Sequence, residues 1–197
     1  MNDKFFDLPK EKQDKIINGA VKIFAINGYK KASTDDMVRD TGVSKGLWFH
    51  YFENKLGLYT FVSDYIIRFY CMELSSMMPE GGDYFKKIYE IERIKVEVSK
   101  FYEYAPMLLT TLVNERDEEA MNAVKGYVRT YLEAIAAPFE NLPDEFSPDI
   151  NTDILDMTIN YTTYGLMKEA YLTGKFARSE YLGSLQAYLD MMRKIAY

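Results

Sequence analysis

The stretch from Thr41 to Lys55, TGVSKGLWFHYFENK, constrains the fold of this chain more than any other. Gly42 follows a short helical pattern, at a point where a residue with positive φ is needed to end a helix. Ser44 can then cap a second short helix, and Asn54 can cap a third. Two helices joined by a short turn that contains glycine form a helix-turn-helix. The stretch therefore predicts a short aromatic helix held between two turns.

An amphipathic helix is expected before this stretch, over residues 9–27. Pro9 suits a first helical position, because its missing N–H costs nothing there. Apolar residues recur at helical spacing from Ile17 to Phe24, and Gly28 follows as a stop signal. Thr34 is expected to cap the next short helix. The predicted core of these three helices contains Phe24, Val38, Val43, Phe49 and Phe52.

These residues resemble the TetR family of bacterial transcriptional regulators. The family pattern runs roughly A-G-V-S-x-G-x-(L/I)-(Y/F)-x-(Y/H)-F-x-(S/N/D)-K-x-x-L. The chain supplies Gly42, Val43, Ser44, Gly46, Phe49, Tyr51, Phe52, Asn54, Lys55 and Leu58. It departs from the pattern at Thr41, Leu47 and Trp48. With the preceding helix, the resemblance covers about residues 10–58.

The resemblance implies that the short helix is a recognition helix in the DNA major groove. Four residues are implied to contact phosphates: Thr34, Ser44, Tyr51 and Lys55. Three residues in the first turn are implied to face the base edges: Lys45, Gly46 and Leu47. Leu47 suits the methyl group of thymine, and Phe49 is expected against sugar-phosphate or a base methyl. His50 either contacts a phosphate or is a merely exposed or packed side chain, and for Trp48 packing is favoured over DNA contact.

Downstream of this motif the sequence predicts helices throughout, with no strand pattern. A long helix is expected over 54–78, ended by Pro79 and two glycines, and further helices near 83–103, 105–112, 115–139, 150–173 and 178–195. Residues 141–148 read as a loop, and Gly174 closes the penultimate helix. The expected fold is all-α with about nine helices. We expect a helix-turn-helix DNA-binding domain at 1–53 and a helical ligand-binding and dimerisation domain at 54–197, with 54–78 as the connecting helix.

The distribution of charge agrees with this division. The chain has a net charge of −6, which by itself argues against a nucleic-acid partner. Residues 1–60, however, hold ten Lys and Arg against eight Asp and Glu, and the remainder holds fourteen against twenty-two. A weakly basic N-terminal segment followed by an acidic remainder is typical of a small DNA-binding domain attached to a domain that does not contact DNA.

Aromatic and sulfur-containing residues are concentrated in the later part of the chain, where fourteen of seventeen tyrosines and nine of eleven methionines lie beyond residue 60. Met adapts to irregular cavities, and Tyr offers a flat apolar face with a hydroxyl. We therefore expect a pocket for a small, largely apolar or aromatic molecule, although the same spacing also suits plain core. The candidate walls are Tyr102, Met107, Leu108, Tyr127, Tyr131, Tyr161, Tyr164 and Met167, with Glu103, Arg116 or Lys168 as polar anchors.

The last helix carries an apolar stripe wide enough to serve a core face and a partner face together. The resemblance implies that it contributes to a dimer, and two copies would double the contacts on a palindromic site. The expected interface residues are Tyr181, Leu182, Leu185, Tyr188, Leu189 and Met192.

Catalysis and metal binding find little support in the sequence. The chain has one histidine and one cysteine, and no spacing resembles HExxH or a Gly-rich phosphate loop. We expect no enzyme activity, no cofactor, no metal, no membrane span and a cytoplasmic location. The expected protein is a homodimeric repressor that a small-molecule effector releases from double-stranded operator DNA. The alternative is a DNA-binding protein of the same fold whose later part recruits a protein partner and senses no small molecule.

Overall fold

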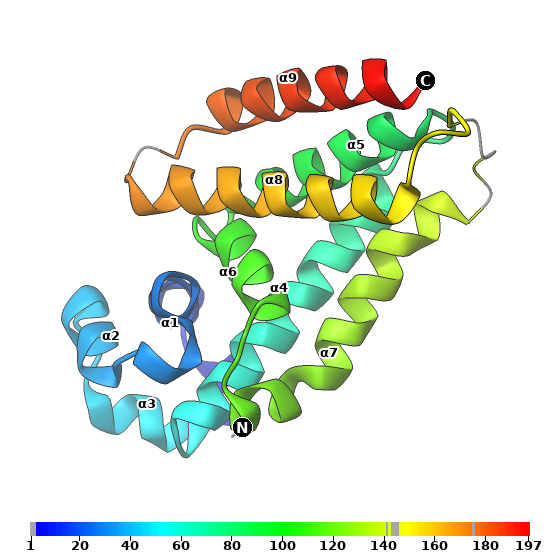
Figure 1. Cartoon of the computed structure of the whole chain (residues 1–197). Coiled ribbons are helices and arrows are strands. Elements are labelled where there is room, and N and C mark those ends of the chain that lie inside the picture. The colour runs from blue at the N-terminus through cyan, green and yellow to red at the C-terminus, as the bar shows by residue number, and fades with distance from the viewer. Residues whose placement is uncertain (1–2, 141, 143–145, 175) are drawn as a thin grey trace.

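The computed structural model describes residues 3–140, 142, 146–174 and 176–197, and the regular elements in these ranges are all helices (Figure 1). The α-helices are α1 (Lys10–Lys31), α2 (Thr34–Thr41), α3 (Lys45–Phe52), α4 (Lys55–Met77), α5 (Tyr84–Glu97), α6 (Ala105–Val113), α7 (Glu118–Ala136), α8 (Thr152–Leu172) and α9 (Arg178–Ala196). Three short 3-10 turns are η1 (Asp3–Asp7), η2 (Val98–Lys100) and η3 (Ala137–Phe139). The predicted all-α architecture is confirmed. Part of the predicted loop at 141–148, namely 141 and 143–145, lies outside the described residues.

The boundaries of the short helices follow from their capping residues. Gly42 ends α2 with a φ of 68°, as the sequence predicts. Asn54 caps α4, and its side-chain oxygen accepts a hydrogen bond from the Gly57 N–H at 2.8 Å. The cap predicted at Thr34 is wrong by one residue, because the Ser33 hydroxyl accepts from the N–H groups of the next turn. Ser44 occupies the N-cap position of α3, but its hydroxyl makes no capping bond there.

Helices α1, α2 and α3 pack into a compact unit, and we refer to residues 3–53 as the head and to the rest as the body. Trp48 is buried in the head, and its indole N–H donates to the Val43 carbonyl at 3.1 Å. Of the predicted core residues, Phe24, Val43 and Phe52 are buried. Val38 and Phe49 are only half-buried, because they lie at the edge of the small core.

The N-terminal turn η1 adds a core residue that helical periodicity did not reveal. Phe5 is fully buried, although it lies before the first amphipathic helix. Its ring centroid is 5.7 Å from that of Tyr51 and 5.2 Å from that of Phe52. Phe61 of α4 joins the same cluster at 5.3 Å from Phe5. These rings fasten the end of α3 and the start of α4 to the N-terminal turn.

The body is built on α4, which runs from the head along α7, while α8 and α9 lie side by side across the far end of the molecule (Figure 1). Helix α6 packs against α1, and α5 packs against α9. Helix α4 is buried along much of its length, as expected for a helix covered on two sides. Its bounds agree with the predicted connecting helix at 54–78.

Candidate functional site

The first turn of α3 is open to solvent. Ser44, Lys45 and Gly46 are exposed, whereas Trp48 and Phe52 in the following turns are buried. A Cβ atom added at Gly46 would meet no other atom within 4 Å. The turn therefore presents a hydroxyl, an ammonium group and bare backbone on a rigidly packed helix. These groups can approach phosphates and base edges without obstruction.

Lys45 is held in place by a weak interaction. Its ammonium nitrogen lies 2.7 Å from a carboxylate oxygen of Asp35 in α2, and both side chains are exposed. An exposed ion pair of this kind contributes between about 0 and 1 kcal/mol to stability. The ammonium group can therefore exchange the carboxylate for a DNA phosphate at little cost.

The remaining predicted DNA-contact residues of α2 and α3 differ in accessibility. Thr34, Leu47 and Phe49 are half-buried, and His50 is exposed with its ring against the Tyr51 ring. Tyr51 has only 8% of its surface exposed, since its ring packs on the aromatic cluster around Phe5. A phosphate contact by Tyr51 is therefore limited to the edge of the ring that reaches the surface.

Lys55, at the start of α4, is engaged within the protein. Its ammonium nitrogen donates to the carbonyls of Tyr29 at 3.0 Å and Ala32 at 3.4 Å, and it lies 4.3 Å from the centroid of the Tyr29 ring. These carbonyls belong to the C-terminal end of α1, where the helix dipole favours a cation. Lys55 thus ties the connecting helix to α1, a role that the sequence did not indicate.

Two further lysines lie beside the first turn of α3, and the sequence did not indicate them as DNA-contact residues. Lys12 and Lys15 of α1 line a shallow hollow together with Ser44 and Leu47 of the α3 region. Both lysines are exposed. Only the packing of α1 against the helix-turn-helix brings these cations near α3, so spacing along the chain could not reveal them.

Glu115 joins the head to the body at the turn between α6 and α7. Its carboxylate accepts from the Tyr29 N–H at 2.8 Å and from the Tyr59 hydroxyl at 3.3 Å. Burial opposes its ionisation, but backbone N–H donors, that of Tyr29 first, outweigh this and lower the pKa of Glu115. Nearby, the Thr111 hydroxyl donates to the Ala25 carbonyl at 2.9 Å.

The geometry of α1 explains why its backbone is available to the body. Gly28 interrupts the helix with a φ of 67° and a ψ of 177°. The Ala25 carbonyl and the Tyr29 N–H, which flank this break, both find partners on the α6 side. The predicted stop signal at Gly28 therefore marks a joint between head and body, although helical residues resume to Lys31.

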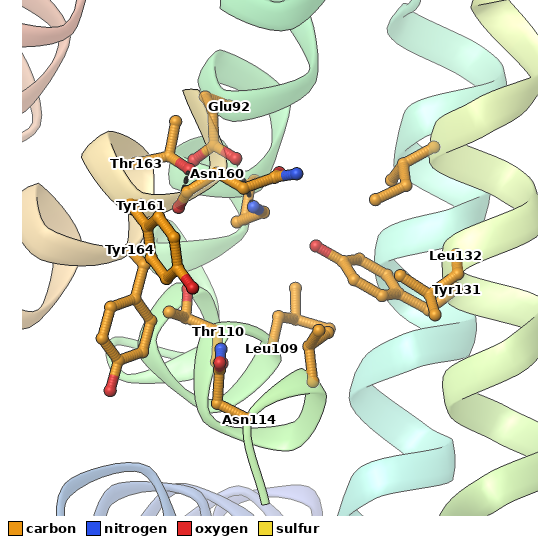
Figure 2. A pocket seen from close by; sticks show the side chains of 13 residues that line it. Glu92, Leu109, Thr110, Asn114, Tyr131, Leu132, Asn160, Tyr161, Thr163 and Tyr164 are labelled. Carbon is orange, nitrogen blue, oxygen red and sulfur yellow. Dashed lines mark hydrogen bonds and ion pairs between the residues drawn. The ribbon is translucent and has the colours of Figure 1, made fainter. Parts of the chain in front are cut away.

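A pocket of about 290 Å³ lies in the body between α5, α6, α7 and α8 (Figure 2). Its apolar wall consists of Leu109, Val113, Leu132 and Ile135. Its polar and aromatic lining consists of Glu92, Lys95, Thr110, Asn114, Tyr131, Asn160, Tyr161, Thr163 and Tyr164. The pocket combines one apolar wall with several convergent polar groups, as small-molecule sites do.

The polar end of the pocket contains a buried ion pair. Lys95 and Glu92 are one helical turn apart in α5, and their charged groups form a close salt bridge. The Tyr181 hydroxyl of α9 donates to the second Glu92 oxygen at 2.7 Å. Burial acts to lower the pKa of Lys95, but Glu92 and then Tyr131 outweigh it and raise the pKa above its ordinary value. The Lys95 ammonium group therefore stays charged.

Three of the predicted wall residues line this pocket: Tyr131, Tyr161 and Tyr164. The other five lie elsewhere. Met107, Leu108 and Met167 are buried in the core, Tyr102 is buried with its hydroxyl against that of Tyr65, and Tyr127 is half-buried outside the lining. None of the proposed anchors Glu103, Arg116 and Lys168 lines the pocket. The charged groups there are Glu92 and Lys95, whose spacing in the sequence is equally typical of a surface pair.

The predicted partner-facing stripe of α9 is mostly a core face. Helix α9 packs on α5 and α8 within the protomer, and this packing buries Tyr181, Leu185, Leu189 and Met192. The prediction that these four residues face a partner is therefore corrected, because they belong to the core of the protomer. Leu182 is half-buried, and Tyr188 is exposed. An apolar face does remain open on the two last helices. It consists of Ile154, Met157, Tyr161 and Leu172 on α8 and Tyr188, Met191 and Ile195 on α9.

Comparison with known proteins identifies the head first. Residues 16–60 match the family model described as bacterial regulatory proteins, tetR family. The matched segment contains most of α1, all of α2 and α3, and the start of α4. No curated protein sequence matches the chain. In the part of the chain that the structure describes, every helix is too short or too polar to span a lipid bilayer.

Solved structures extend the similarity to the whole fold. The fatty acid degradation regulator FadR from Bacillus halodurans has 19% identity and a TM-score of 0.59, over 89% of this chain and 96% of that chain. A TetR-family regulator from Rhodococcus sp. has 16% identity and a TM-score of 0.62, over 93% and 99%. FadR from Bacillus subtilis in complex with stearoyl-CoA has 13% identity and a TM-score of 0.61, over 90% and 96%. At these identities the likeness shows a shared fold.

Proposed function

Because this chain is a TetR-family transcriptional regulator, we propose that it is a homodimeric repressor released from a pseudo-palindromic operator by a small molecule. The observation that carries the proposal is the open first turn of α3, set on a buried aromatic base. Ser44, Lys45 and Gly46 would meet phosphates and base edges in the major groove. Lys12 and Lys15 would add backbone contacts beside this turn.

The short DNA segment that one head can contact favours a dimer. A single recognition helix contacts few base pairs, whereas two helices about 34–36 Å apart would read successive turns of the same groove. The exposed apolar face of α8 and α9 supports such a pairing, since contiguous exposed apolar patches mark association sites. The same patch on each copy can pair about a two-fold axis.

The dimer can be tested by placing like charges on this face. Met157→Glu combined with Met191→Glu should convert the protein to a monomer in sedimentation, because two acidic groups per copy would be buried at the axis. Operator affinity should fall at least tenfold. The control is Met121→Glu, an exposed methionine of α7 outside this face. A double variant that still sediments as a dimer would refute the proposed interface.

Release by a ligand requires that the ligand bind more tightly to a conformation whose recognition helices are wrongly spaced. The body pocket is well placed for this, because Val113 and Asn114 of its lining directly precede Glu115. Glu115 in turn contacts Tyr29 of the head and Tyr59 of the connecting helix. A regulator of the same fold, FadR from Bacillus subtilis, forms a complex with stearoyl-CoA.

The direct experiment begins with selection of the operator from a random duplex library. Fluorescence anisotropy on the selected duplex then measures release during a metabolite screen, with thermal unfolding as the parallel readout. A ligand at a hundred times its Kd should stabilise the protein by about 2.7 kcal/mol. A protein that binds the duplex but is neither stabilised nor released by any metabolite, and instead retains a specific protein partner, would favour the alternative of partner recruitment.

A further inference from the structure

We propose that the body pocket recognises an uncharged ligand through a carbonyl-type acceptor oxygen, which hydrogen-bonds to the Lys95 ammonium and the Tyr131 hydroxyl. The inference rests on the proposed function in treating this pocket as the effector site, and it names the chemical class of the effector. It depends on which hydrogen-bonding groups at the polar end of the pocket already have partners.

Lys95 has a donor left over. An ammonium group carries three N–H donors and no acceptor. One donor serves the Glu92 carboxylate, and the ammonium nitrogen also lies beside Tyr131, 6.0 Å from the centroid of its ring. The described residues supply no other acceptor within hydrogen-bond distance of Lys95, although the side chain is almost completely buried. A buried N–H group without a partner favours an acceptor brought by the ligand.

Tyr131 supplies the second donor. A phenol hydroxyl carries one O–H donor, and no acceptor among the described residues lies within hydrogen-bond distance of the Tyr131 hydroxyl. Figure 2 shows the Tyr131 hydroxyl pointing from α7 into the pocket. Burial raises the pKa of Tyr131 even though the nearby Lys95 ammonium acts to lower it, so the hydroxyl stays protonated. Lys95 and Tyr131 therefore offer two donors to one position.

The balance of charge at this end of the pocket selects against an anionic ligand. Glu92 already neutralises Lys95, and the two Glu92 oxygens are taken by Lys95 and Tyr181. A ligand carboxylate would bring a second negative charge to a buried pair that has no positive charge to spare, and an uncompensated buried charge is costly. A ketone, quinone or amide oxygen satisfies the same donors without adding charge.

The remaining lining sets the shape of the ligand. Leu109, Val113, Leu132 and Ile135 form the apolar part of the lining. Figure 2 shows Tyr161 and Tyr164 on the opposite side of the pocket from Tyr131 and Leu132. A volume of about 290 Å³ is at the lower end of the range for small-molecule sites. The pocket therefore suits a molecule of about two fused rings with one carbonyl oxygen at its edge.

Three probes of similar size test the class directly: α-tetralone with a carbonyl, tetralin without an acceptor, and tetralin carboxylate with a negative charge. Calorimetry and ligand-observed NMR on the full chain should show α-tetralone binding at least tenfold more tightly than the other two. Equal or tighter binding of tetralin or the carboxylate would overturn the inference. So would the absence of α-tetralone binding at millimolar concentration.

The donor assignment is tested by Tyr131→Phe, which removes one hydroxyl and keeps the ring. The variant should lose most of the preference for α-tetralone over tetralin. Tyr127→Phe is the matched control, since Tyr127 lies one turn earlier in α7 and outside the pocket lining. A Tyr131→Phe protein that folds normally and keeps the preference would overturn the assignment.

The same probes separate this inference from the proposed function when operator release is measured beside binding. Tyr131-dependent binding of α-tetralone without release of the operator would support the ligand class and contradict the proposed release. Operator release by an anionic or acceptor-free compound that binds in this pocket would support the release and overturn the ligand class.

Discussion

Among single residues, Lys55 combines two roles that are usually considered separately. Its position at the start of α4 suggests a phosphate contact, yet its ammonium group already binds two carbonyls at the end of α1 and lies over the Tyr29 ring. Hydrogen bonds from a charged donor contribute more to stability than neutral ones do. Any loss of DNA affinity on its removal would therefore contain a structural part.

Comparison of Lys55→Ala with Lys45→Ala separates these parts. Lys55→Ala should lower the free energy of unfolding by about 1–2 kcal/mol, because two carbonyls and a ring lose a charged partner. Lys45→Ala should change it by less than about 0.5 kcal/mol, since that ion pair is exposed. Lys45→Ala should nevertheless reduce the salt dependence of DNA binding by about one phosphate contact. Urea unfolding measures the change in stability, and fluorescence anisotropy at several salt concentrations measures the change in DNA binding. A Lys55→Ala protein of unchanged stability would contradict the assigned structural role.

Gly46 offers a test of the recognition turn that does not depend on charge. An added methyl group would meet nothing within the protein, and Ala is a better helix former than Gly by up to about 1 kcal/mol. Gly46→Ala should therefore unfold at the same or a higher temperature, while its operator affinity falls about tenfold because the methyl group stands where a base edge must approach. Gly126→Ala in α7, also open at Cβ, is the control for stability without DNA contact. Unchanged operator affinity for Gly46→Ala would mean that this turn does not approach the bases.

Between elements, the packing of α1 on α2 depends on one close approach. A Cβ atom at Gly19 would lie 2.1 Å from the Cγ2 methyl of Thr41. The Thr41 hydroxyl is also engaged, donating to the Met37 carbonyl at 2.7 Å and accepting from the Val43 N–H at 3.2 Å. Thr41 is one of the positions where the chain departs from the TetR pattern, which has Ala. The larger side chain fits here because its neighbour is glycine.

A double-mutant cycle tests this pairing. Gly19→Ala should destabilise the protein by about 1–3 kcal/mol through overpacking. Thr41→Ser removes the clashing methyl group and keeps the hydroxyl, so the double variant should recover most of the loss. A coupling free energy above about 0.5 kcal/mol from thermal or urea unfolding would support direct contact. Additive effects of the two changes would refute it.

At the scale of the whole molecule, head and body are joined by side chains that meet at Glu115. The Tyr29 N–H and the Tyr59 hydroxyl both donate to its carboxylate, and Tyr29 also reaches Glu119 through its hydroxyl at 3.2 Å. Burial raises the pKa of Tyr29 to about 12, so its hydroxyl remains a donor at neutral pH. The joint lies between the body pocket and the start of the connecting helix.

The lowered pKa of Glu115 predicts a specific pH dependence of stability. A carboxylate whose pKa is lowered by folding stabilises the protein above the pKa of the unfolded chain, 4.5, and this contribution is lost as the pH falls toward the lower folded value. Glu115→Gln should therefore be less stable than the parent by about 1–2 kcal/mol at neutral pH, with a difference that shrinks below about pH 4.5. The control is Glu133→Gln, an exposed glutamate of α7. A difference that stayed constant down to pH 3 would contradict this account.

Some features of the fold could be predicted because their signals are local. Gly42 and Asn54 carry capping chemistry that depends on neighbouring residues only, and they mark the ends of α2 and α4 within the structure. The break at Gly28 has the same local origin. The burial of Phe5 and the burial of the Glu92–Lys95 pair could not be predicted in this way, because both depend on packing by residues distant in sequence.

The sequence by itself determined the all-α class, the helix-turn-helix and its family, since helical periodicity, capping residues and the TetR pattern are properties of consecutive residues. Only the tertiary structure decided which face of α9 is core, which tyrosines line the pocket, and that Lys55 binds the end of α1. The physical reason is that an apolar stripe or a charged pair has the same spacing whether it faces the core, a partner or solvent. The elements that pack against it settle that choice.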